Sequence, residues 1–163
     1  MKFVTSLVCA AAAIACLPAA HADVLAKAKE SGEITFAYRE SSVPFSYLAG
    51  GQNAIGFSVD ISNAVADAVR KEIGKPDLKV KWQPVTSANR IPLIQNGTVA
   101  LECGSTTNNS ARNKDVDFAI NYFYTGTRVA VKKSAGIKNW ADLKGKTLAI
   151  TTGTTNLPVV RKY

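Results

Sequence analysis

The hydrophobic and polar positions of this chain follow two periods, one of two residues and one of four. The period of two occurs in residues 33–38 (EITFAY) and again in residues 78–85 (LKVKWQPV), where it is typical of β-strands. Two more strands are predicted at residues 99–105 (VALECGS) and 127–133 (TRVAVKK). The sequence therefore predicts several short strands separated by other structure.

The period of four marks a helix at residues 57–73, which Gly74 brings to an end. A shorter helix follows the strand at 78–85. It begins after a cap at Thr86 or Ser87 and ends at residues 96–97, an Asn-Gly pair. Helices are thus expected between consecutive strands.

Two further stretches complete the pattern. Residues 41–56 (SSVPFSYLAGGQNAIG) are predicted to form a loop, because proline and paired glycines interrupt them. Residues 139–156 (NWADLKGKTLAITTGTTN) predict a short helix, a turn, a strand and the start of another helix. Strands that alternate with helices indicate an α/β fold with a parallel or mixed sheet.

Polar side chains gather at the carboxyl ends of the predicted strands, where ligands of α/β sheets bind. Arginine pairs with a carboxylate through two parallel hydrogen bonds, so two arginines at one crevice suit a ligand with two carboxylates. Serine and threonine hydroxyls can donate to a carboxylate or accept from an ammonium group. Any one of them alone is more often a helix cap or a solvated loop residue. The prediction rests on the convergence of six positions: Arg39, Ser87, Arg90, Ser105, Thr107 and Thr155.

Other ligand classes fit less well. Residues 104–109 (GSTTNN) and 151–155 (TTGTT) resemble phosphate-binding loops only loosely, because neither has the P-loop lysine at the required spacing. A nucleotide ligand is therefore not expected. Two acidic residues, Glu102 and Asp60, could pair with a ligand ammonium or with the arginines.

Residues 1–22 have the pattern of a cleavable secretory signal, with Lys2 before an apolar run and small residues at Ala20 and Ala22. The apolar run is near the lower limit of about 17 residues for a membrane span, and Pro18 lies close to its end. Cleavage after Ala22 and export to the periplasm are expected. Lipid attachment at Cys16 is the alternative, although the residues before it match a lipoprotein box poorly.

Cleavage there leaves a chain without histidine and with Cys103 as its one thiol. A Ser-His-Asp triad, a Cys-His dyad and a zinc site of the Cys/His type are thereby excluded, and no cofactor or metal is expected. Nineteen basic and 12 acidic residues remain, a net charge of +7. The basic residues are scattered and not interleaved with aromatic ones, so an acidic small molecule is a better partner than nucleic acid.

The order of several blocks resembles the polar amino-acid-binding proteins of ABC transporters, solute-binding family 3, and within it the members for glutamate and aspartate. The resemblance implies a periplasmic binding protein-like fold, with two lobes and a hinge that close on one amino acid. It also implies a monomer that delivers its ligand to a transporter permease in the inner membrane. The blocks cover nearly all of residues 23–163: RESSVPFSY, GFSVDISNAVADAV, TSANRIPLIQNG, ECGSTTNN, GTR and LKGKTLAITTGTT.

The resemblance assigns roles as well. All six candidate positions match ligand contacts of the family, and Arg90 would hold one carboxylate while Arg39 holds the other. Residues 23–122 would form the first lobe, and residues 123–163 would begin a second lobe that is incomplete in this chain. The disulfide partner of Cys103 would lie in the absent return to the first lobe, so a C-terminally truncated fragment is expected.

Two other functions stay open. An enzyme on the same fold, like the relatives that dehydrate cyclic amino-acid precursors (cyclohexadienyl dehydratase-like), needs a carboxylic acid in the cleft, and Glu102 is the candidate. A truncated chain without function is the other alternative. Fold alone does not choose among them.

Overall fold

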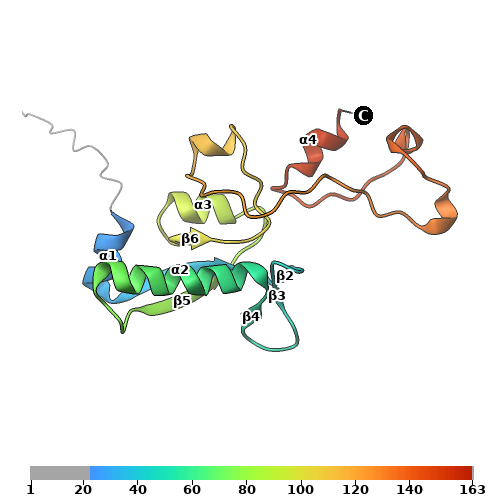
Figure 1. The fold of residues 1–163 in the computed structure, drawn as a ribbon. Helices are drawn as coiled ribbons and strands as arrows, with labels where there is room; N and C mark the ends of the chain where they lie inside the picture. Colours follow the sequence, from blue (N-terminus) through green and yellow to red (C-terminus); the bar gives the residue numbers. More distant parts are fainter. Residues whose placement is uncertain (1–22, 163) are drawn as a thin grey trace, which may run out of the picture.

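The computed structural model describes residues 23–162. The predicted signal peptide, with its cleavage site and Cys16, lies outside these residues, as does Tyr163. Figure 1 shows helices packed around a small sheet in the first part of the chain and a long extended arm after it. Within residues 23–162, no helix has the length and apolar character needed to cross a membrane.

The main sheet has three parallel strands in the order β5-β1-β6. Strand β1 (Glu33–Tyr38) lies in the middle, and β5 (Lys79–Pro84) pairs along its whole length. Strand β6 (Leu101–Glu102) pairs only with residues 36 and 37 of β1. The parallel sheet predicted from the alternating pattern is confirmed, although β6 is much shorter than the predicted strand at 99–105.

Three helices flank this sheet: α1 (Val24–Ser31), α2 (Phe57–Ile73) and α3 (Arg90–Gln95). Helix α2 has the predicted bounds and ends because Gly74, at φ 66°, donates its N–H to the carbonyl groups of the last turn. Helix α1 was not predicted. It begins where the Asp23 carboxylate accepts a hydrogen bond from the N–H of Leu25 at 2.9 Å.

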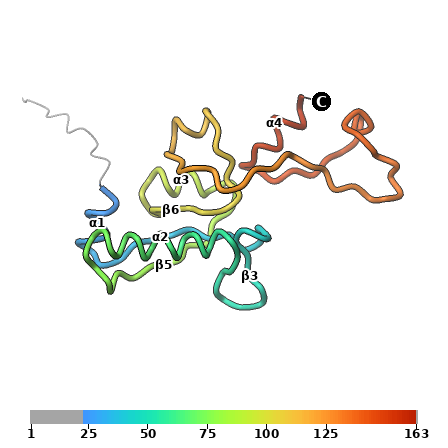
Figure 2. Tube along the Cα trace, in the orientation of Figure 1, coloured from blue at the N-terminus to red at the C-terminus, as the bar shows by residue number. Residues whose placement is uncertain are grey.

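The core lies on both faces of β1, because successive strand residues point to opposite sides. Ile34 and Phe36 pack against α1 and α2 in a cluster that also includes Ala28, Ala66, Ile73 and Leu78. On the other face, Ala37 packs with Val85 and Val99, and side chains of α3 cover them. The result is a three-layer arrangement that fixes the carboxyl end of β1 between α2 and α3 (Figure 2).

The region predicted as a loop at residues 41–56 is instead a small antiparallel sheet of β2 (Ser41–Ser42), β3 (Ser46–Leu48) and β4 (Ala54–Ile55). The Ser46 hydroxyl, fully buried, holds this sheet against the end of β1. It donates to the carbonyl of Arg39 at 2.9 Å and accepts from the Arg39 N–H at 2.8 Å. The prediction was wrong because strands of two or three residues are too short to show a period.

Residues after β6 contain no strand within the described part of the chain, and the later ones form the arm of Figure 1. The predicted strand at 127–133 and the strand predicted within 139–156 are therefore wrong for this structure. A strand exists only when a neighbour accepts and donates its backbone hydrogen bonds, and here no described segment pairs with either. The regular elements after β6 are short: η1 (Arg112–Lys114), η2 (Lys133–Ala135), η3 (Trp140–Leu143) and α4 (Asn156–Val160).

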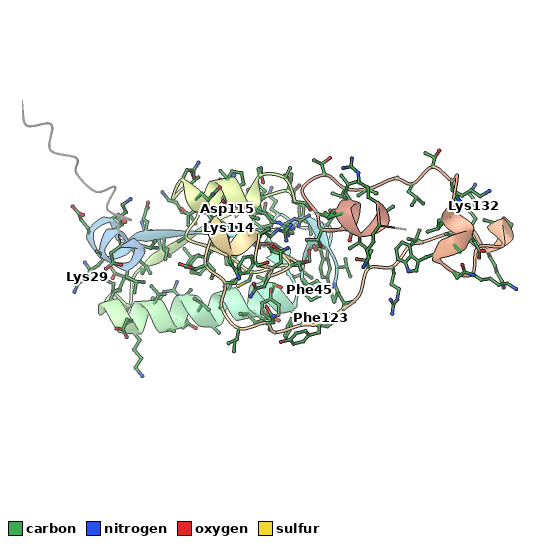
Figure 3. The ribbon with its side chains drawn as sticks, turned by 90° about the horizontal axis from the view of Figure 1, so that it is seen from above. Lys29, Phe45, Lys114, Asp115, Phe123 and Lys132 are labelled. Atoms are coloured by element: carbon green, nitrogen blue, oxygen red, sulfur yellow. The ribbon has the colours of Figure 1, made fainter. Side chains whose placement is uncertain are left out.

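Two of these elements confirm the pattern read from residues 139–156. The predicted short helix appears as the 3₁₀ helix η3, capped by Asn139 and Asp142 in a reciprocal box. The predicted helix start appears as α4, preceded by Thr155. Figure 3 shows that Lys132 lies at the far end of the arm, while Phe45 and Phe123 lie side by side where the arm meets the first part of the chain.

Candidate functional site

The carboxyl ends of the main strands carry most of the predicted site residues. Arg39 directly follows β1, and Ser87 lies in the turn between β5 and α3. The structure joins them, because Arg39 Nη2 donates to Ser87 Oγ at 3.2 Å. The predicted cap of α3 is correct only in part. Thr86 and Asn89 exchange hydrogen bonds between side chain and backbone, whereas the Ser87 hydroxyl is left for Arg39.

Arg90 is the first residue of α3, and its side chain is only 3% exposed. Its Nη1 atom lies 3.9 Å from Oε1 of Glu102. Neither Nε nor Nη1 of Arg90 has a hydrogen-bond partner among the described residues. Burial lowers the pKa of Arg90 to about 10, with Glu102 opposing that shift and the nearby Arg39 and Arg112 adding to it. The guanidinium therefore stays charged at neutral pH.

Glu102, the last residue of β6, supplies the carboxylate next to Arg90, and its side chain is 6% exposed. Its Oε2 atom accepts a hydrogen bond from the Thr106 hydroxyl at 2.5 Å, while Oε1 has no hydrogen-bond partner among the described residues. Gly104 leaves the room that this carboxylate needs, since a Cβ there would collide with it. Thr106 thus holds one oxygen of the carboxylate, while the other oxygen makes no hydrogen bond to the described residues.

Arg39 keeps one guanidinium nitrogen unpaired among the described residues. Its Nη1 atom is buried without a partner, while Nη2 binds Ser87 and its backbone is held by Ser46. Arg39 and Arg90 are therefore neighbouring guanidinium groups that each keep unpaired donors. Unpaired buried donors are costly, so this arrangement stabilises an anion that enters it.

The remaining predicted residues come from the loops after β6 and before α4. The hydroxyls of Thr107 and Thr155 lie 3.3 Å apart, although 48 residues separate them along the chain. The Ser105 hydroxyl lies 3.1 Å from that of Ser42, on strand β2. Ser105 and Thr107 are both exposed.

Arg112 was missed in the sequence. Its Nη1 donates to the carbonyl of Thr107 at 2.9 Å and its Nη2 donates to the carbonyl of Gly153 at 3.0 Å. Burial lowers its pKa. Gly153, at φ 77°, lies so close to Ser87 and Ala88 that a Cβ would collide with their backbone. The sequence did contain a sign of this role, because Arg112 ends the polar run that begins after β6. Its hydrogen bonds to backbone carbonyls, however, exist only in the folded chain.

Three guanidinium groups and one carboxylate therefore share this region: Arg39, Arg90, Arg112 and Glu102. The balance of formal charge is positive by two. Asp60 does not alter it, since this residue is exposed on α2. The arrangement can bind an anionic ligand, and it offers more hydrogen-bond donors than acceptors to that ligand.

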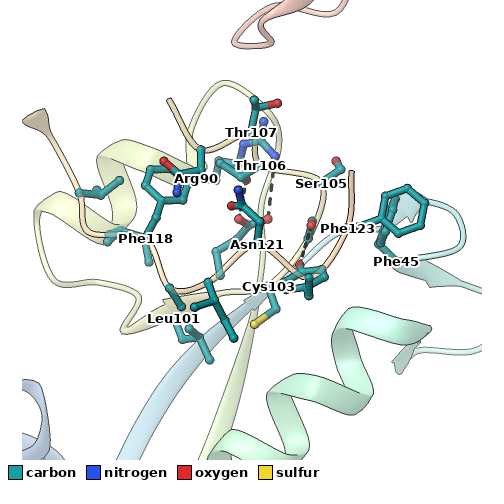
Figure 4. Close-up of a pocket in the computed structure, with 18 of the residues that line it drawn as sticks. Phe45, Arg90, Leu101, Cys103, Ser105, Thr106, Thr107, Phe118, Asn121 and Phe123 are labelled. Atoms are coloured by element: carbon teal, nitrogen blue, oxygen red, sulfur yellow. Dashed lines mark hydrogen bonds and ion pairs between the residues drawn. The ribbon is translucent and has the colours of Figure 1, made fainter. Parts of the chain in front are cut away.

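A cavity of about 460 Å³ opens beside these groups, between β6 and residues 116–125 (Figure 4). Arg90, Glu102, Ser105 and Thr107 line its polar part, whereas Arg39, Ser87 and Thr155 lie outside its lining. Phe45, predicted to wall the crevice or pack in the core, lines the cavity and contacts Phe123 edge to face at 5.0 Å.

Among residues 23–162, no group of His, Cys, Asp and Glu side chains could hold a metal ion. Cys103 is a buried free thiol whose pKa is raised by burial. Its expected disulfide stays a prediction.

Comparison with known proteins places this chain in a family. The family model described as bacterial extracellular solute-binding proteins, family 3, matches residues 34–162. The glutamate/aspartate import solute-binding protein of Salmonella typhimurium is 51% identical over 138 residues, which is 85% of this chain and 46% of that protein. The L-glutamate/L-aspartate-binding protein of Pseudomonas aeruginosa is 53% identical over 133 residues, 81% of this chain and 44% of that protein. The chain thus spans about half the length of the curated relatives it matches.

A solved structure gives the fold. An ancestral amino-acid-binding protein, described as a precursor of cyclohexadienyl dehydratase, superposes with a TM-score of 0.71 and 28% identity. The match covers 86% of this chain and 60% of that one. The predicted α/β fold of the periplasmic binding protein type is confirmed.

Proposed function

Because this chain belongs to the bacterial extracellular solute-binding proteins of family 3, we propose that it binds an acidic amino acid, L-glutamate or L-aspartate, for an ABC importer. The names of the relatives at 51% and 53% identity support this ligand class. The structure supports it independently through the charge of the site.

One observation carries the proposal. Arg39 and Arg90 both keep buried guanidinium atoms without hydrogen-bond partners, next to a single carboxylate. A buried charge needs a partner, and an arginine fork binds a carboxylate through two parallel bonds. A ligand with two carboxylates supplies one partner to each arginine. Four hydroxyls would complete its contacts: Ser87 bonds Arg39, Ser105 and Thr107 line the cavity with Arg90, and Thr155 contacts Thr107.

The proposal includes the compartment and the partner. The protein reaches the periplasm through a cleavable signal peptide in residues 1–22, acts there as a monomer and delivers its ligand to a permease in the inner membrane. The family description, which names extracellular proteins, supports the compartment. No chemical step is proposed for the ligand, because the similar curated relatives are described as import and binding proteins.

Calorimetric titration tests the ligand class. Purified wild-type protein, Arg39→Ala and Arg90→Ala are each titrated with glutamate, aspartate and glutamine. Wild type should prefer the two dicarboxylates, and the variant that loses its preference for glutamate over glutamine identifies the arginine that faces the side-chain carboxylate. Equal losses for glutamate and glutamine in both variants would contradict the two-carboxylate model.

The enzymatic alternative has one observation in its favour, the likeness to a precursor of cyclohexadienyl dehydratase. Its candidate acid, Glu102, already accepts a bond from Thr106 and lies beside Arg90. Product formation from a cyclic amino-acid precursor, lost in Glu102→Gln, would favour the enzyme over the binding protein.

A further inference from the structure

Glu102 is the acidic side chain that the described residues place in ion-pair range of Arg90. The closest atoms of the pair are Arg90 Nη1 and Glu102 Oε1. At 3.9 Å the two atoms attract each other but lie beyond the 2.7–3.2 Å of a hydrogen bond. Neither atom therefore has a hydrogen-bond partner among the described residues.

The position of the Glu102 carboxylate is fixed from its other side. Thr106 donates to Oε2 at 2.5 Å, and Gly104 provides the space into which the carboxylate fits. A rotation that brought Oε1 within hydrogen-bond distance of Arg90 would have to break or bend the bond to Thr106. The negative charge is thus held near Arg90 without occupying its donors.

The other two arginines of the site each donate to at least one neighbour, although Arg39 Nη1 has no partner among the described residues. Arg112 donates to two backbone carbonyls, and Arg39 donates to Ser87. Arg90 is the most buried of the three guanidinium groups and the one that the described residues place in ion-pair range of Glu102. Burial lowers the pKa of Arg112, and Glu102 opposes that shift as well.

We propose that Glu102 is the resident counter-anion of the site: it balances the charge of Arg90 while leaving its donors free, and it thereby sets how strongly the site prefers a ligand with two carboxylates. The inference rests on the proposed function and adds a residue to it. Glu102 acts through Arg90 and through its field, so it is a positioning residue that makes no bond to the ligand.

The consequence for binding follows from the sign of the charge. A fixed carboxylate a few ångströms from Arg90 repels the incoming ligand carboxylate and limits affinity for anions. Removing that charge without changing the shape of the side chain should tighten the binding of dicarboxylates. It should tighten the binding of a monocarboxylate less.

Three ligands distinguish this role of Glu102 from two others, which are binding of the ligand ammonium group and a purely structural role. Glutamate carries two carboxylates and an ammonium group, glutamine lacks the second carboxylate, and glutarate lacks the ammonium group. Each is titrated against wild type and Glu102→Gln, with thermal unfolding as a check on the fold. We expect at least tenfold tighter binding of glutamate and of glutarate in the variant, and a higher ratio of glutamate to glutamine affinity.

The other outcomes overturn the proposal. If Glu102 held the ligand ammonium, Glu102→Gln would weaken glutamate and glutamine and leave glutarate unchanged. If its role were only structural, all three affinities would fall by one common factor. A wild-type protein that bound none of the three ligands would contradict the proposed function itself, which is a different result from an unchanged selectivity.

Thr106→Val provides a second variant of opposite sign, in case Glu102→Gln does not fold. It keeps the charge of Glu102 but removes the hydroxyl that restrains Oε2. The carboxylate is then free to hydrogen-bond Arg90 and compete with the ligand, so glutamate should bind several-fold more weakly. Unchanged or tighter glutamate binding in Thr106→Val would count against the restrained counter-anion.

Discussion

Residues 23–122 and residues 123–162 belong to one chain but differ in what covers their apolar side chains. Every buried residue of the described part lies at or before Cys103. In the later region, Tyr124 is 81% exposed and Phe123 is 55% exposed. Both regions contain alternating apolar blocks, so the pattern states a preference for strand, and only a paired neighbour turns that preference into a sheet.

The two regions also differ in charge. Residues 23–122 contain 11 basic and 11 acidic side chains, whereas residues 123–163 contain eight basic and one acidic. The whole net charge of +7 therefore belongs to the later region, where all eight basic side chains are exposed. The explanation of this charge by an acidic ligand is thus incomplete, because the site draws its positive charge mainly from Arg39, Arg90 and Arg112.

Amide hydrogen exchange should show the largest contrast between the regions. Amides of β1 should exchange only through global unfolding, which in small domains costs about 5–15 kcal/mol, while amides of residues 127–133 should open at a cost near zero. Mass spectrometry of peptic fragments measures both. Equal protection of the two segments would break the comparison, since it would require the later segment to be paired.

A substitution that creates a cavity in the core should lower the free energy of unfolding by almost as much. Phe36 is 1% exposed and packs against α1 and α2, so Phe36→Ala should lower the free energy of unfolding by about 3–5 kcal/mol. The matched control is Leu157→Ala in α4, where the side chain is 41% exposed and the expected change is within about 1 kcal/mol. Urea titration compares them, and a loss at Leu157 as large as that at Phe36 would show a second core.

Ligand affinity should depend on the first region more than on the second. Arg39→Ala and Arg90→Ala should each lose about 2–5 kcal/mol of binding free energy for glutamate, because each strands a carboxylate. Deleting a hydroxyl in Ser105→Ala or Thr155→Val should lose about 1 kcal/mol. Calorimetry with and without a chelator measures these losses, and the chelator should change none of them. A loss at Thr155 as large as that at Arg90 would contradict this ranking.

The smallest effect is expected in the later region, at the cap of η3. The Asp142 carboxylate accepts hydrogen bonds from the N–H groups of Lys138 and Asn139, which lowers its pKa. The cap is therefore stable above the unfolded pKa of about 4 and is lost as pH falls through the lowered folded value. Nuclear magnetic resonance of the two amides should report a local change below pH 4 that is absent in Asp142→Asn.

The sequence predicted those elements that have a clear hydrophobic period and that pair or pack with a neighbouring element. Helix α2 appears with its predicted bounds, and β1 pairs in parallel with β5 as the alternating blocks indicated. Helix α1 was missed because its eight residues, VLAKAKES, mix alanine and lysine without a clear apolar stripe. Long periodic segments could thus be read from sequence, and short or unpaired ones could not.

The site shows the same limit. Residue type and position after a strand were enough to select Arg39 and Arg90, which the structure brings near each other. They were not enough to find Arg112, whose partners are two backbone carbonyls. Nor could they decide whether Glu102 meets an arginine or an ammonium group, because that choice depends on distances of a few ångströms between α3 and β6.

The contact between Thr107 and Thr155 closes a loop of 48 residues, and the bond from Arg112 to Gly153 closes one of 41. The entropic cost of closing such a loop rises slowly with its length, by about 0.6 kcal/mol for each doubling. A ligand held between the two ends would keep this loop closed, so its measured affinity would include part of that cost. Substitutions or deletions in the middle of the loop, around residues 130–147, can therefore change ligand affinity through chain entropy without touching the ligand.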